Sequence, residues 1–132
     1  MNEPILISMK TGGQWLVSPV GDTNIFCRES FTNDHKDIEN MVKEFVKDRI
    51  YPNVEAIDKL DKDLSLTILR EMGELGLIGV DTPEEYGGSG LDKITSCIVT
   101  EGVSQGGSAS FSWTFGVQTG IGSMGIVFFG TP

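Results

Sequence analysis

The stretch FTNDHKDIENMVKEFVKDRIYPNVEAI, residues 31–57, decides the fold class of this 132-residue chain. Thr32 can cap a helix, and Asp34 suits the positive end of the helix dipole. Pro52 lacks a backbone N–H, so the helix should kink or break near Tyr51. Apolar residues recur three and four positions apart, which is the spacing of one helix face; they are Ile38, Met41, Val42, Phe45, Val46, Ile50, Val54 and Ile57. The stretch therefore predicts a long amphipathic helix with one interruption.

Capping and turn signals predict further helices and no strand. Gly76 should end a second helix that follows a solvated linker at residues 58–63. Thr82-Pro83 should start a single helical turn that Gly87 ends. The helices expected after the first span about residues 65–75, 92–105, 109–120 and 123–132. Because no alternating run of strand length occurs, the predicted class is all-α.

The composition is typical of one soluble globular domain. Hydrophobic residues make up 39% of the chain and charged residues 22%, which are ordinary values for such proteins. We expect residues 1–30 to form an arm, extended or partly disordered, and residues 31–132 to form a helical domain. The net charge of −9 argues against nucleic-acid binding, because phosphate binding needs clustered Lys and Arg.

The cysteine and histidine content argues against a metal site. Cys27 and Cys97 are far apart with no CxxC motif, and His35 is the only histidine, so no zinc ligand set is expected. Isolated cysteines fit a reducing compartment, in which Cys97 would be a small buried hydrophobe. Glu3 stands where a secretory signal needs a basic region, so the predicted location is cytoplasmic. We expect His35 to be a solvated surface residue.

The last 31 residues, from Gly102 to Pro132, carry no charge, whereas all 29 charged residues precede them. A surface of this kind is expected to be covered by something else. A transmembrane helix over residues 111–129 is disfavoured by its polar side chains and by the lack of flanking Lys or Arg. A G-x-G-x-x-G motif spans residues 120–125, but dinucleotide binding needs a preceding strand, and close helix packing is the favoured interpretation.

Three segments together resemble the acyl-CoA dehydrogenase family. They are residues 31–52, which open with Phe31-Thr32; residues 72–90, which contain MGELGLIGV and PEEYGGSG; and residues 118–131, which open with QTGIGS. Their order and spacing match over about 100 residues. Lys10-Thr11-Gly12-Gly13 also resembles the arm of a bacterial long-chain subgroup.

The resemblance implies an N-terminal helical bundle, which in the family precedes a β middle domain and a C-terminal four-helix bundle. The complete enzymes use FAD to remove the α and β hydrogens of fatty acyl-CoA thioesters in fatty acid β-oxidation. Electrons usually pass to an electron-transfer flavoprotein. The family's catalytic glutamate lies downstream of Pro132, so we expect no catalytic residue here and no flavin bound to the chain alone. The chain alone should be inactive, and the complete enzyme should be a homo-oligomer.

By position, the resemblance implies that five residues form part of the acyl pocket, namely Thr114, Phe115, Val117, Gln118 and Ile121. Many relatives carry histidine where this chain has Gln118, and a charged or larger residue is common where it has Gly102. Interdomain packing is the alternative role for each of the five positions. A second hypothesis is a stand-alone interaction module that binds a partner or itself through the uncharged C-terminal helices.

Overall fold

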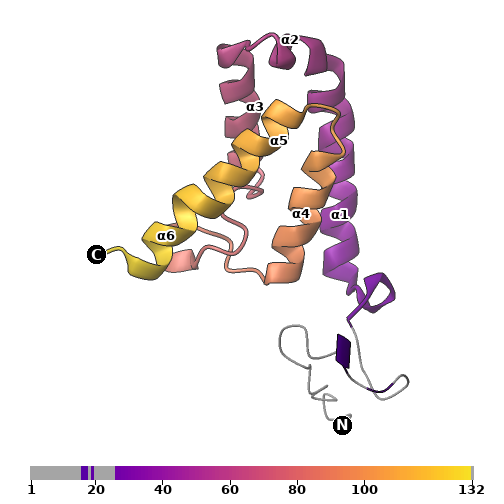
Figure 1. Ribbon diagram of the computed structural model, residues 1–132, viewed down its shortest axis with the longest axis vertical. Coiled ribbons are helices and arrows are strands. Elements are labelled where there is room, and N and C mark those ends of the chain that lie inside the picture. Colours follow the sequence, from indigo (N-terminus) through magenta and orange to yellow (C-terminus); the bar gives the residue numbers. More distant parts are fainter. Residues whose placement is uncertain (1–15, 18, 20–25, 132) are drawn as a thin grey trace. The chain divides into compact units, whose positions relative to one another are not determined.

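The computed structural model describes residues 16–17, 19 and 26–131, which fall into two compact units, Met1–Thr32 and Asn33–Pro132 (Figure 1). In the first unit, a 3₁₀ turn, η2, covers Arg28–Ser30. The Phe26 and Phe31 rings stack with centroids 5.9 Å apart, and the Arg28 guanidinium lies 5.5 Å from the Phe31 centroid. Most of the predicted arm, including Lys10–Gly13, lies outside the described residues.

The second unit opens with a long helix that changes type around Pro52. Helix α1 spans Asn33–Phe45 and continues through a π-helical turn, η3, over Val46–Ile50. A 3₁₀ turn, η4, over Tyr51–Asn53 leads into α2, Val54–Asp58. Proline cannot donate to the helix ladder, and the Asn53 side-chain Nδ2 donates to the Arg49 backbone carbonyl at 2.8 Å. The predicted interruption near Tyr51 is confirmed as a change of helix type.

Helix α3 spans Lys62–Glu74 and begins earlier than the predicted Ser65. The Asp61 carboxylate accepts the Leu64 N–H at 3.0 Å, and such an N-cap starts a helix. The predicted stop at Gly76 is confirmed, because this residue has φ +73° and the Leu77 N–H donates to the Met72 carbonyl at 2.9 Å. The linker predicted at residues 58–63 is therefore reduced to residues 59–61.

A loop containing one 3₁₀ turn, η5, Glu84–Tyr86, leads to α4, Lys93–Ser104. The Asp92 carboxylate caps α4 by accepting the Thr95 N–H at 2.8 Å. This cap confirms the predicted helix start near residue 92. The prediction that Cys97 is buried is wrong, since its side chain is exposed. Val99 is buried instead, because the α4 face that packs on α1 passes through residue 99 and not residue 97.

The two helices predicted from residue 109 onward are one. Helix α5, Ala109–Gly116, passes through a π-helical turn, η6, Val117–Ile121, directly into α6, Gly122–Phe129. Ser108 caps α5 and also donates its hydroxyl to the Asp58 carboxylate at 2.6 Å. This bond ties the start of α5 to the end of α2. The expected break between residues 120 and 123 is wrong, because a π-helical turn carries the helix across these positions.

The core confirms the all-α class. Helices α1 and α4 lie side by side (Figure 1), and Gly102 permits their close approach, since a Cβ there would overlap Val42 Cγ1. Arg49, in η3, donates two hydrogen bonds to the carboxylate of Glu71 in α3, at 2.6 and 2.5 Å, and so links these two elements. The buried core comprises Val42, Phe45, Val46, Ile50, Ile57, Ile68, Met72, Leu77, Val80, Val99, Val103, Phe111 and Phe115.

Candidate functional site

The structure separates the five predicted acyl-pocket residues. Phe115 is only 2% exposed and belongs to the core. Val117 and Ile121 share a cleft of about 260 Å³ beside the end of α4. Thr114 lines a different groove, of about 390 Å³, between α5 and the α2–α3 corner. Gln118 is exposed. Only Val117 and Ile121 are therefore brought together, and the roles of all five stay a prediction.

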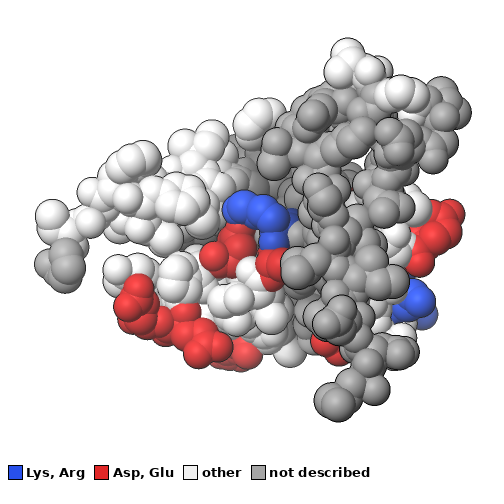
Figure 2. Space-filling view, turned by 90° about the horizontal axis from the view of Figure 1, so that it is seen from below, with Lys and Arg blue, Asp and Glu red and all other residues white. Residues whose placement is uncertain are grey.

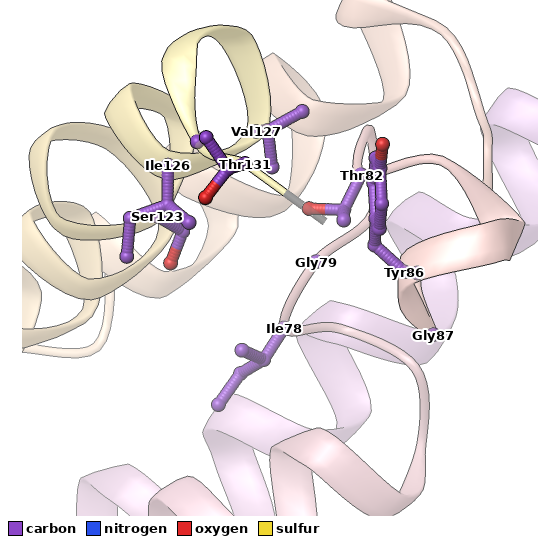
Figure 3. Close-up of a pocket in the computed structure, with 11 residues that line it drawn as sticks. Ile78, Gly79, Thr82, Tyr86, Gly87, Ser123, Ile126, Val127 and Thr131 are labelled. Carbon is purple, nitrogen blue, oxygen red and sulfur yellow. The ribbon is translucent and has the colours of Figure 1, made fainter.

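A cleft of about 540 Å³ lies between α6 and the loop that follows α3. Figure 3 shows Ser123, Ile126 and Val127 on the helix across from the loop that carries Gly79 and Thr82. The remaining lining residues are Ile78, Tyr86, Gly87, Gly88, Gly130 and Thr131. No lining side chain is charged, so this cleft suits a neutral or apolar occupant.

The loop wall of this cleft is held by backbone hydrogen bonds. The Ser89 N–H donates to the Gly79 carbonyl at 3.0 Å, and the Gly90 N–H donates to the Thr82 carbonyl at 2.9 Å. Gly88 passes so close to Thr82 that any Cβ would overlap the Thr82 carbonyl. The sequence predicts no site role for this loop, although its cluster of glycines is a signal for such close backbone approach.

The uncharged C-terminal segment forms an exposed apolar surface. Figure 2 shows the projection that ends at the C-terminus without Lys, Arg, Asp or Glu on the visible face. Large side chains are exposed along it, with Phe129 at 88% and Ile121 at 81%. The others are Trp113, Val117, Ile126 and Phe128. We call these six residues the apolar face of α5–α6. Exposed apolar side chains of this number on one helix commonly mark a contact site.

Titratable groups meet away from this face, where α1 and α4 begin. His35 is buried, which corrects the prediction of a solvated residue, and its Nε2 lies 3.1 Å from Asp92 Oδ2. His35 is buried because the start of α4 packs against the first turn of α1. Burial opposes ionisation of Asp92, but hydrogen bonds from Thr95 and the contact with His35 outweigh it and lower the pKa of this carboxyl. The arrangement is a capped and paired carboxylate that joins two helices.

Other site types find no support in the part of the chain that the structure describes. Its Cys, His, Asp and Glu residues form no cluster able to hold a metal ion. None of the described helices is long and apolar enough to cross a bilayer. The G-x-G-x-x-G motif at residues 120–125 lies inside the continuous α5–α6 helix, so it does not form a strand-to-helix phosphate loop.

Comparisons with known proteins agree on one family. Residues 32–132 match the family described as "Acyl-CoA dehydrogenase, N-terminal domain". The chain is 41% identical over 123 residues to a probable acyl-CoA dehydrogenase of Bacillus subtilis, covering 93% of this chain and 20% of that protein. It is 36% identical over 94 residues to the mitochondrial isovaleryl-CoA dehydrogenase of Arabidopsis thaliana, covering 69% and 22%.

A solved structure gives the same answer. The crystal structure of an acyl-CoA dehydrogenase complexed with FAD from Bacillus anthracis matches with a TM-score of 0.83 and 40% identity. The match covers 91% of this chain and 20% of that chain. This chain thus spans about a fifth of the length of these relatives.

Proposed function

This chain belongs to the acyl-CoA dehydrogenase family, whose N-terminal domain it matches over residues 32–132, and we propose that it serves an FAD-dependent dehydrogenase of fatty acyl-CoA thioesters. In that enzyme it would supply the N-terminal helical domain for α,β-dehydrogenation in β-oxidation. The observation that carries the proposal, beside the family match, is the apolar face of α5–α6. An exposed face of this kind, free of charge, is what a domain shows when other domains and an acyl chain normally cover it.

The acyl-pocket role is assigned to five residues of the α5–α6 helix. Val117 and Ile121 are exposed, by 43% and 81%, and line one cleft, so they can contact an aliphatic chain directly. Thr114 and Gln118 are exposed on the same helix and would lie at the margin of the pocket. Phe115 is buried in the core, so we assign it the role of supporting the helix from behind.

These residues do not by themselves fit FAD. A flavin dinucleotide carries a charged pyrophosphate, which proteins bind with basic side chains or with the amides of a helix N-terminus. The cleft of about 540 Å³ between α6 and the loop after α3 has no charged lining residue, and the glycine motif lies inside the continuous α5–α6 helix. We therefore assign the flavin, the catalytic base and the electron-transfer flavoprotein contact to other parts of a complete cytoplasmic, homo-oligomeric enzyme.

The proposal is tested by expressing the 132-residue chain alone and as part of the complete protein. The complete protein should purify yellow and reduce an artificial electron acceptor in the presence of a fatty acyl-CoA. The chain alone should be colourless and inactive. A colourless, inactive complete protein would refute the dehydrogenase assignment. A yellow 132-residue chain would instead refute our view that its residues cannot hold flavin.

The alternative is a stand-alone interaction module, favoured by the 88% exposure of Phe129. It predicts that the 132-residue chain binds a partner or itself through the apolar face of α5–α6. Size-exclusion chromatography with light scattering separates the cases. A stable monomer that binds no hydrophobic dye would speak against self-association and against an uncovered interface.

A further inference from the structure

The continuous α5–α6 helix contains a π-helical turn at the level of the proposed acyl contacts. The N–H of Gly122 donates to the carbonyl of Val117, five residues earlier. The residues on either side keep right-handed helical backbone angles, with φ −63° at Gly116 and φ −73° at Gly122. One extra residue is therefore accommodated without breaking the helix.

Two neighbouring residues account for this turn. In an α-helix the Gly122 N–H would bond the Gln118 carbonyl, but here it bonds Val117, so the Gln118 carbonyl loses that amide. The Ser123 hydroxyl donates to the Gln118 carbonyl in its place. A Cβ at Gly122 would lie 3.1 Å from the Val117 oxygen, which is tight, so the absence of a side chain eases the turn.

The other π-helical turn described in this chain, η3, has a different explanation. It ends two residues before Pro52, and its side chains Val46 and Ile50 are buried, at 3% and 1% exposure. Proline and core packing are sufficient causes there. The turn over Val117–Ile121 contains no proline, and none of its five residues is buried. Core packing does not explain it, and π-helical turns of this kind are frequent at functional sites.

The extra residue changes which way the helix faces. One residue corresponds to about 100° of rotation in a helix of 3.6 residues per turn. With the turn in place, Val117 and Ile121 face the α4 cleft while Ser123 and Ile126 face the loop after α3. Removing the extra residue would rotate Ser123 and Ile126 by about that angle relative to Val117.

We propose that Ser123 is a positioning residue, whose hydroxyl holds the π-helical turn and thereby sets how Val117 and Ile121 meet the acyl chain. This inference rests on the proposed function. Ser123 would act through the backbone and not through the substrate. Its removal should therefore alter the preference among acyl chain lengths more than the maximal rate.

The test uses the complete protein that carries this segment, with saturated acyl-CoA thioesters of increasing chain length. Ser123→Ala should change the ratio of kcat/KM between long and short chains by about tenfold, equivalent to about 1.4 kcal/mol, mainly through KM. Ser123→Thr keeps the hydroxyl and should keep the profile. Thr67→Ala is the matched control, because the Thr67 hydroxyl donates to the Asp63 carbonyl at 2.8 Å on the exposed face of α3.

Amide hydrogen exchange on the same proteins reads the turn directly. Ser123→Ala and Gly122→Ala should each speed exchange at Ile121–Ser123, whereas Gly125→Ala should not, because its added methyl meets no atom within 4 Å. An active wild type whose Ser123→Ala variant keeps both the profile and the exchange rates would overturn the positioning role alone. A wild type without dehydrogenase activity would overturn the proposed function as well, so the two failures are distinguishable.

Discussion

Replacing Gly102 by alanine tests the closest helix contact in the core. A Cβ at this position would overlap Val42 Cγ1 and lie 3.3 Å from Val42 Cβ. Val42 is 1% exposed and β-branched, so its side chain has no free rotamer to move into. Helices α1 and α4 must then separate. Overpacking of this kind costs about 1–3 kcal/mol.

The matched control is Gly73→Ala, because Gly73 also lies in the last turns of a helix but has no atom within 4 Å of an added Cβ. Both substitutions gain the helix propensity of alanine, about 1 kcal/mol. That gain cancels in the comparison, so the difference between the two variants isolates the steric cost.

Thermal unfolding followed by circular dichroism should place the Gly102→Ala midpoint below that of Gly73→Ala. For a domain of this size each 1 kcal/mol corresponds to roughly 4–8 °C, so the separation should be about 5–20 °C. Equal midpoints would refute the reasoning, since they would mean that α1 and α4 have room for the methyl group.

Asp92→Ala should lower the unfolding free energy by about 1 kcal/mol at neutral pH, because it removes the cap of α4. The pKa of Asp92 in the folded protein lies below its ordinary 3.8, so the ionised carboxylate stabilises the fold above that pH. The difference in unfolding free energy between wild type and Asp92→Ala should therefore shrink as the pH falls through the folded pKa. A difference that stays constant in thermal unfolding at acid pH contradicts this. Arg49→Lys should lower the unfolding free energy despite keeping the charge, because the bidentate contact with Glu71 is lost. In a Glu71→Gln background the same substitution should leave the unfolding free energy unchanged. Phe111→Ala should cost about 3–5 kcal/mol in a denaturant titration, whereas Trp113→Ala, exposed on the same helix, should cost under about 1 kcal/mol.

Local signals in the sequence predicted the helices well. Asp92 and Gly76 each act on amides or carbonyls a few residues away, as the Asp92 bond to Thr95 shows, so their effect can be read without knowing the fold. Pro52 changes the helix type for an equally local reason. The predicted start at Ser65 is too late, because the sequence around the Asp61 cap is typical of an acidic linker.

The candidate site was less accessible to sequence reasoning. Its loop wall depends on Gly88 meeting the Thr82 carbonyl, and its other wall depends on the helical rotation set by Ser123. Regular α-helical spacing would have kept Val117, Ile121 and Thr114 on one face. Thr114 nevertheless lines a different cleft from Val117 and Ile121, and periodicity carries no signal for the π-helical turn over Val117–Ile121.

The sequence by itself determined the all-α class, most helix ends, the family resemblance and the uncharged C-terminal segment, because each depends on residue types at short separations. Only the tertiary structure decided that His35 is buried against Asp92, that Cys97 is exposed and that Phe115 lies in the core. These depend on which helix faces meet. That choice is made by packing between segments more than 50 residues apart, as the His35–Asp92 contact shows, and no local pattern records it.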